Sequence, residues 1–188
     1  MVRCAILLAI LLASATSAQE PMPVVQRGLF RAYATLCPGR LLQHPLSHIN
    51  VAAGAEYMLE DRVGIRADAL WYLASQRAEP IVSENSRTLV GASFHFPHGA
   101  GDLHTDFQTG IGLCQPFSEQ HDGTVQPLRV VPAVSFVVGY NHYVWRYLHF
   151  FAEARYVRSR YVVPNEGALL LDEVMIAGGL GWQLSPKR

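Results

Sequence analysis

Apolar and polar side chains alternate along most of this chain, in about eight stretches of roughly ten residues each. Residues 63–71 show the pattern clearly. Every second position there is apolar, namely Val63, Ile65, Ala67, Ala69 and Trp71. A period of two places successive side chains on opposite faces of a strand. Weak alternation repeated this often is typical of a transmembrane β-barrel, whose strands turn one face to lipid and the other to the lumen.

The alternating stretches predict eight strands, near residues 26–36, 49–59, 63–74, 88–96, 103–114, 130–142, 147–160 and 172–184. The connections between them are alternately short (60–62, 97–102, 143–146) and long (37–48, 75–87, 115–129, 161–171). Bacterial barrels have an even strand number, short periplasmic turns and longer extracellular loops. We therefore expect an all-β fold: one eight-stranded antiparallel transmembrane β-barrel, connected as an up-and-down meander.

The parity of each strand also assigns its faces. Two strongly alternating strands predict the residues that face lipid, which are Ala67, Ala69, Trp71, Phe150 and Ala152. Aromatic residues near the strand ends suit the girdles that such barrels place at both membrane interfaces.

The first 18 residues are expected to be a secretory signal peptide. One basic residue, Arg3, precedes an apolar run and a stretch of small residues, and cleavage after Ala15 or Ala18 fits equally well. The apolar run is too short for a spanning helix, which needs about 20 residues. Residues 19–188 are then a single barrel domain.

Charge and hydropathy narrow the class of protein further. The formal net charge is +0, so no basic field points to nucleic acid. No later stretch is long enough to be a membrane helix, and only helices and closed barrels satisfy every backbone polar group in lipid. An outer membrane of a Gram-negative type of bacterium is the expected location.

Parity places a set of charged residues inside the barrel. These are Arg31, Glu56, Arg66, Asp68, Asp106, Glu153, Arg155 and Glu173, together with His95, His104 and His149. Eight strands enclose a lumen just wide enough for side chains, and charges buried there must pair. We expect a structural network that plugs the lumen. A proton or ion pathway and a catalytic carboxylate or histidine site are the alternatives.

No motif in the sequence indicates a cofactor, a metal or a nucleophile. The histidines lack the close spacing of metal ligands, and neither Ser47 beside His48 nor Ser93 near His95 has the context of an activated serine. Cys37 and Cys114 permit one disulfide, or remain two separate buried thiols, because the first and fifth strands lie on opposite sides of an eight-stranded barrel.

Four segments resemble the small outer-membrane barrels of the OmpA/OmpX-like superfamily. Residues 54–68 are similar to the family's second strand, tight turn and third strand, and Gly139-Tyr140 and residues 153–156 to its later strands. The last strand, residues 179–184, resembles the C-terminal insertion signal, although it ends in Leu184 rather than Phe and Ser185 to Arg188 follow it. The resemblance implies recognition by the barrel assembly machinery through Gly179, Trp182 and Leu184.

We expect a non-enzymatic outer-membrane protein, structural or binding an unidentified partner through its outer loops. The expected surroundings are outer-membrane lipid and lipopolysaccharide, and the expected state is a monomer. A lipid-modifying enzyme, of the lipid A acyltransferase or deacylase type, is one alternative. A secreted lipocalin-like barrel is another, and it would need a polar outer face.

Overall fold

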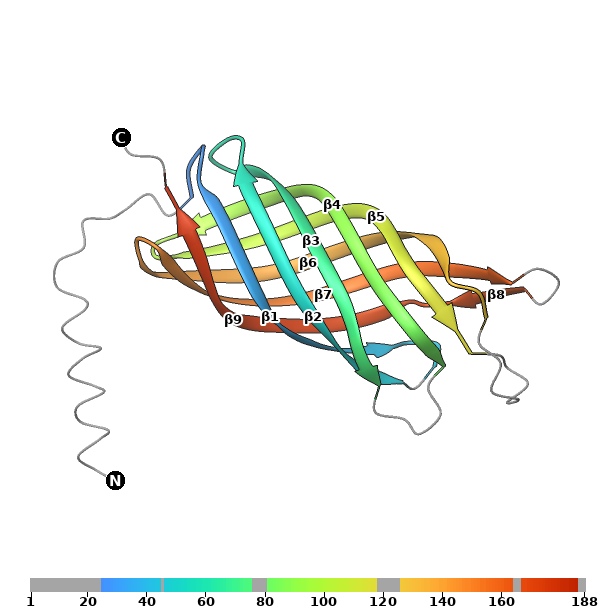
Figure 1. Cartoon of the computed structure of the whole chain (residues 1–188). Coiled ribbons are helices and arrows are strands. Elements are labelled where there is room, and N and C mark those ends of the chain that lie inside the picture. Colours follow the sequence, from blue (N-terminus) through green and yellow to red (C-terminus); the bar gives the residue numbers. More distant parts are fainter. Residues whose placement is uncertain (1–24, 45, 76–80, 118–125, 164–166, 186–188) are drawn as a thin grey trace, which may run out of the picture.

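The computed structural model describes residues 25–44, 46–75, 81–117, 126–163 and 167–185 (Figure 1). Its strands are β1 (Phe30–Leu41), β2 (Ser47–Met58), β3 (Val63–Ser75), β4 (Val82–His98), β5 (Gly101–Pro116), β6 (Arg129–Trp145), β7 (Leu148–Val163), β8 (Gly167–Leu170) and β9 (Glu173–Leu184). The expected signal peptide lies outside the described residues. Within the described ranges, no helix is long and apolar enough to cross a membrane.

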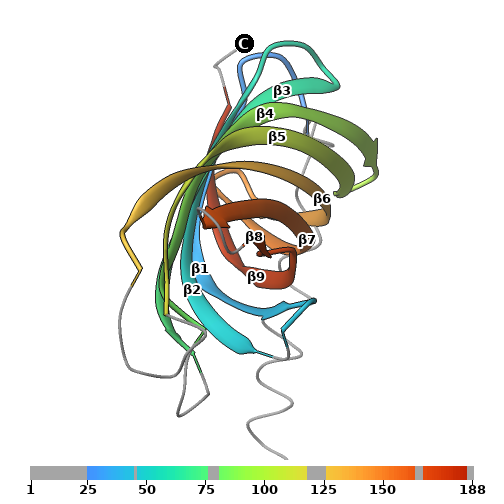
Figure 2. The same ribbon diagram turned by 90° about the vertical axis from the view of Figure 1, so that its right-hand side faces the viewer.

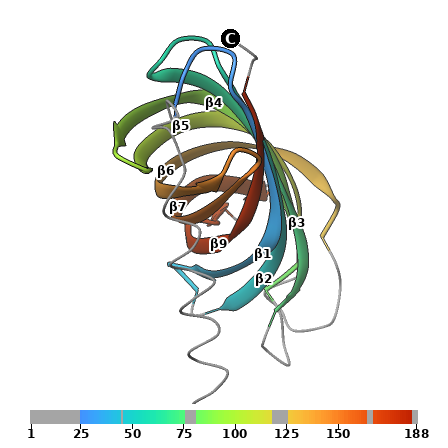
Figure 3. The same cartoon turned by 90° about the vertical axis from the view of Figure 1, so that its left-hand side faces the viewer.

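The strands form a closed antiparallel barrel. Neighbours in sequence pair from β1 to β7, β9 pairs with β7 on one side and with β1 on the other, and the sheet therefore returns to its start (Figure 3). The short β8 pairs with the far end of β7, and β8 and β9 together supply the eighth strand of the wall. The predicted fold class is confirmed.

The seam between β1 and β9 is paired at its two ends. Residues 30–32 pair with 182–184, and residues 39–41 pair with 173–175. Between these zones no backbone ladder joins the two strands, and the hydroxyl of Thr35 donates to the carbonyl oxygen of Gly178 (2.8 Å). The barrel is thus closed at both rims, with a side-chain bond in the middle of the seam.

The outer wall is apolar. The side chains of Trp71, Phe107 and Phe150 are 51%, 61% and 54% exposed, as is typical of a surface that meets lipid instead of water. Ala67 and Ala152 are exposed as well, and Ala69 is half-buried on the same face. A soluble barrel carries polar residues there, so the lipocalin-like alternative is wrong.

The strands are longer at one end than the sequence predicted. Three tight turns, at residues 59–62, 99–100 and 146–147, mark the end expected in the periplasm, and the opposite end is the extracellular one (Figure 2). There β4 begins at Val82 rather than near residue 88, and much of the predicted loop 161–171 is a hairpin of β7 and β8. β1 is also displaced from 26–36 to Phe30–Leu41. Outside the membrane a strand needs no apolar outer face. Its sequence therefore lacks the alternation that predicts a strand and resembles the sequence of a loop.

Candidate functional site: the barrel lumen

The inner wall of the barrel is lined with buried charges. All eight charged residues predicted to be lumenal are less than 9% exposed and turn inward. They are Arg31, Glu56, Arg66, Asp68, Asp106, Glu153, Arg155 and Glu173. The three histidines expected with them, His95, His104 and His149, are buried too. The structure brings all of these groups except His149 together in three separate networks, and His149 packs against the rings of Tyr143 and Phe151.

The periplasmic network is built around Arg31 of β1. This guanidinium forms an ion pair with Glu56 of β2, and its Nη1 lies 3.3 Å from Oδ2 of Asp102 and donates to the hydroxyl of Tyr143 at 2.7 Å. His95 joins the same two carboxylates, since Nδ1 is 2.7 Å from Asp102 and Nε2 is 2.7 Å from Glu56. Each charge therefore meets an opposite charge or a hydrogen bond.

The central network is built around Arg66 of β3. Its Nη1 lies 2.7 Å from Asp106, its Nη2 lies 2.6 Å from Glu153, and its Nε lies 3.0 Å from Asp68. Arg155 of β7 reaches Asp68 from the other side of the lumen, with Nη2 2.5 Å from Oδ2. Three carboxylates thus share two arginines, and the planar guanidinium suits such shared contacts because it donates in several directions.

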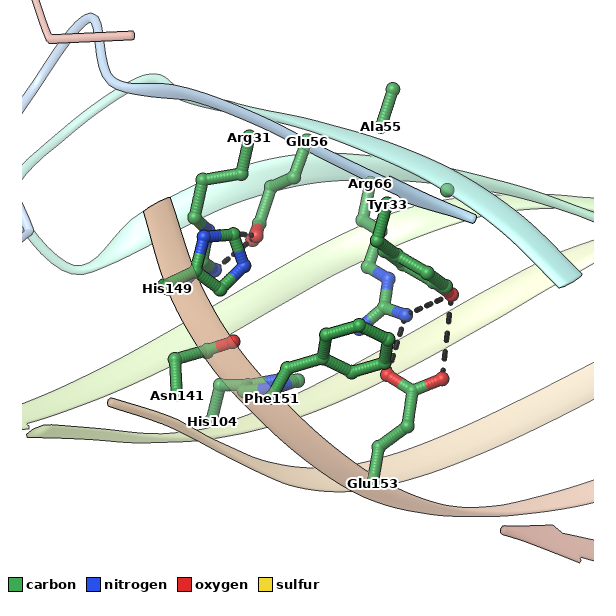
Figure 4. Close-up of a pocket in the computed structure, with 11 residues that line it drawn as sticks. Arg31, Tyr33, Ala55, Glu56, Arg66, His104, Asn141, His149, Phe151 and Glu153 are labelled. Atoms are coloured by element: carbon green, nitrogen blue, oxygen red, sulfur yellow. Dashed lines mark hydrogen bonds and ion pairs between the residues drawn. The ribbon is translucent and has the colours of Figure 1, made fainter. Parts of the chain in front are cut away.

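Neutral groups complete the central network. The hydroxyl of Tyr33 accepts from Arg66 (2.6 Å) and donates to Asp68 (2.8 Å), while the side-chain amide of Gln108 donates to Asp68 (2.7 Å) and accepts from Arg155 (2.9 Å). Gly54 leaves the room for this arrangement, because a Cβ there would lie 2.2 Å from Asp68 and 2.3 Å from the ring of Tyr33. Figure 4 shows Tyr33, Arg66 and Glu153 converging from three strands.

The extracellular network joins Arg87 of β4 to Glu173 of β9. The two form an ion pair, and Arg87 also donates to Asn85 (3.1 Å) and Ser159 (3.2 Å). Nε2 of His48 lies 3.0 Å from the other carboxylate oxygen of Glu173. Glu173 therefore belongs to a network of its own, apart from the other predicted lumenal charges.

Apolar layers separate and cap the networks. Along β7 the inward residues run from Glu153 and Arg155 through Val157 to Ser159 and Tyr161. Polar and apolar layers therefore alternate along the barrel axis. The middle apolar layer is Cys37, Ala52, Leu70, Leu89, Ala133, Val157 and Met175. The extracellular layer is Leu41, Leu46, Val82, Cys114, Val131, Tyr161 and Leu171, and the periplasmic one is Val25, Leu29 and Met58. An ion crossing the lumen would have to pass all three.

We expect the refolded protein to conduct ions weakly or not at all. The pocket between the periplasmic and central networks is lined by groups that already pair with one another, among them Arg31, Glu56 and Arg66 (Figure 4). Single-channel recording in planar bilayers measures this, with an open porin as the positive reference. A large and stable open state would contradict the plugged lumen.

Sequence reasoning missed several residues of the networks, among them His48, Asn85 and Tyr143, which fall in segments predicted to be loops or turns. Arg87 falls in a segment predicted to be a loop, and Asp102 in one predicted to be a turn, so neither received an inward face. Tyr33 has the inward parity of β1, but its role becomes visible only through its contacts with Arg66 and Asp68.

Cys37 and Cys114 are free thiols. Cys37 lies in the middle apolar layer and Cys114 in the extracellular one, so the disulfide considered from the sequence does not form in this structure. Among the described residues, no group of three or more His, Cys, Asp or Glu is arranged to hold a metal ion.

Solved structures with the same fold were found, although the sequence matches no protein-family model and no curated protein. Neisserial surface protein A is 13% identical, with a TM-score of 0.60 over 82% of this chain and 95% of that one. Outer membrane protein OprG from Pseudomonas aeruginosa is 10% identical, with a TM-score of 0.60 over 86% and 98%. Ail, the attachment invasion locus protein of Yersinia pestis, is 12% identical, with a TM-score of 0.54 over 85% and 100%.

These similarities concern the fold, because the identities are low. They agree with the closed antiparallel meander of this chain. The chain has the fold of the small eight-stranded outer-membrane β-barrels of the OmpA/OmpX-like type, and its apolar outer wall suits it to that membrane.

Proposed function

We propose that the protein is a non-enzymatic outer-membrane barrel that acts by presenting its extracellular strand ends and loops to a binding partner. The lumen serves as the rigid core of this scaffold. Binding sites commonly lie in loops held by a rigid framework, since loops vary freely while the framework positions them.

The observation that carries the proposal is the length of the strands. β4 and β6 have 17 residues each, and β5 and β7 have 16. A transmembrane strand needs about 9–11 residues. About six residues of each strand therefore project beyond the membrane, which corresponds to about 15–20 Å of ordered sheet at about 3.3 Å per residue. The tight periplasmic turns put this excess at the extracellular end.

The extracellular ends are also held in place from inside. Leu41, Val82 and Tyr161 of three different strands pack together in the extracellular apolar layer. The extracellular ends of these strands are thereby joined into one platform. Two of the proteins with this fold are described as a surface protein and as an attachment invasion locus protein, which fits a role at the cell surface.

An enzyme that modifies lipid needs a nucleophile or base on the lipid-facing side of the outer rim. The histidines with the most elaborate contacts face the lumen instead: His95 is 1% exposed and His104 2%, and each lies next to a carboxylate. Ser86 lies near the extracellular end, and its hydroxyl donates to Glu84. These contacts favour a structural role for the polar residues of the barrel.

The proposal is tested by comparing two variants in a strain that lacks the wild-type protein. One has the loops at 76–81 and 117–128 shortened, and the other carries His95→Gln, His104→Gln and His149→Gln. Adherence of the cells to epithelial monolayers and immobilised matrix proteins is measured, and heat-modifiable gel mobility verifies that each barrel is folded. We expect the loop variant to lose the wild-type contribution and the histidine variant to retain it. The opposite result would replace the binding role with a lumenal, enzymatic one.

A further inference from the structure

Three arginines stand on the outer face of the wall at its extracellular end. Along β7, Val157, Ser159 and Tyr161 are buried, whereas Arg158 and Arg160 between them are exposed. Arg40 of β1 is exposed as well. β9 lies between the two strands, and Val174 pairs with both Arg40 and Tyr156. Arg40, Arg158 and Arg160, the arginine rim, therefore share one face across two strand spacings, about 10 Å.

The height of the rim matches the outer edge of a membrane. Arg158 is ten residues beyond Leu148, which begins β7 at the periplasmic turn. At about 3.3 Å per residue and a strand tilt of about 40°, this separation is about 25 Å along the membrane normal, the height of the apolar band of such barrels. Phe150 and Ala152 lie within the band, and the guanidiniums begin where the band ends.

The arginines of the rim differ from those of the lumen in that they lack ion pairs with described carboxylates. The four buried arginines, Arg31, Arg66, Arg87 and Arg155, each form ion pairs with carboxylates. Within the described ranges, no carboxylate forms an ion pair with any guanidinium of the rim. Asp172 lies close to β7, but it is only 9% exposed and its Oδ2 accepts a hydrogen bond from Tyr156 (3.1 Å).

We propose that Arg40, Arg158 and Arg160 bind the phosphate groups of lipopolysaccharide in the outer leaflet. The guanidinium remains charged and binds phosphate through two parallel hydrogen bonds. Arg158 and Arg160 lie about 7 Å apart on the same strand face, and Arg40 lies on the far side of β9, so a phosphorylated headgroup can be held against the seam. The inference rests on the proposed outer-membrane location and is independent of the loop partner.

The test compares two variants of the purified full-length barrel in detergent micelles. The rim variant is R40Q/R158Q/R160Q. The matched control is R27Q/R62Q/R146Q, which removes three exposed charges at the periplasmic end. Native mass spectrometry measures the fraction of barrel that carries lipid A as the lipid A concentration rises.

The expected loss of affinity follows from the number of charges removed. Each basic residue at an anionic membrane surface is worth about a fivefold change in affinity, so the rim variant should bind lipid A roughly a hundredfold more weakly than the wild type. The control should stay within about twofold. R40K/R158K/R160K should bind more tightly than the rim variant and less tightly than the wild type, because lysine keeps the charge and loses the paired hydrogen bonds.

Two further probes identify the ligand group. Lipid A stripped of both phosphates should bind the wild-type barrel as weakly as intact lipid A binds the rim variant. Phosphatidylglycerol should bind clearly less tightly than lipid A. Equal affinity of the wild type and the rim variant, of both forms of lipid A, or of phosphatidylglycerol and lipid A would each overturn the proposal. Heat-modifiable mobility shows that every variant is folded, and it separates a failure of this site from a failure of the barrel.

Discussion

Replacing Arg66 with Met is expected to lower the free energy of unfolding by about 3–5 kcal/mol, the usual cost of removing one partner from a buried ion-pair network. Arg66 is 4% exposed and contacts three carboxylates, those of Asp68, Asp106 and Glu153. Methionine fills a similar volume but donates no hydrogen bond. Arg155 alone would then face three negative charges. Urea titration of the folded barrel in lipid vesicles, followed by tryptophan fluorescence, measures the change.

Two variants test whether the loss of stability comes from buried carboxylates left without a partner. Arg62 lies exposed in a periplasmic turn, and Arg62→Met should change the free energy of unfolding by no more than about 0.5 kcal/mol. Adding Glu153→Gln to Arg66→Met removes one uncompensated carboxylate, so the double variant should be more stable than Arg66→Met. A loss below about 1 kcal/mol for Arg66→Met would mean that water, and not Arg66, satisfies these carboxylates.

Parity along the strands was sufficient to predict the inward position of this arginine. Within the membrane one face must be apolar, so Ile65 and Ala67 leave Arg66 only the lumen. The same reasoning placed Glu153 and Arg155 inside, and Glu153 is 87 residues from Arg66 along the chain. Because side chains alternate with a period of two, the face of a residue depends on local sequence alone, and it can be predicted without knowing the pairing.

Which charges pair could not be predicted in this way. Arg66 meets Glu153 because β3 and β7 face each other across the lumen, a relation set by the closure of the barrel. The partner of Glu173 was missed because Arg87 lies in the projecting part of β4, where Glu84 and other polar residues hide the strand pattern. Inside the membrane the sequence predicts which way a side chain points, because one face of each strand must be apolar. Above the membrane both faces can contact water, and the sequence predicts the side-chain direction less well.

Substitutions on the outer face of the wall are expected to have a similarly large effect on stability. Ala69→Arg and Ala152→Arg are each expected to lower the free energy of unfolding by about 2–4 kcal/mol, the cost of an arginine at the middle of the lipid-facing surface. Ala69 lies between Ala67 and Trp71 on β3, and Ala152 lies two residues beyond Phe150 on β7, well inside the apolar band. Urea titration in vesicles of neutral lipid measures both.

Val130→Arg is the matched control. Val130 is also on the outer face, 62% exposed, but it lies near the extracellular start of β6, where the cost of an arginine falls to about 0–1 kcal/mol. The difference between the control and the two inner positions reports depth in the membrane rather than the size of the new side chain. If Ala69→Arg and Ala152→Arg were as stable as Val130→Arg, these faces would be in contact with water, and the assignment of this wall to lipid would have to be withdrawn.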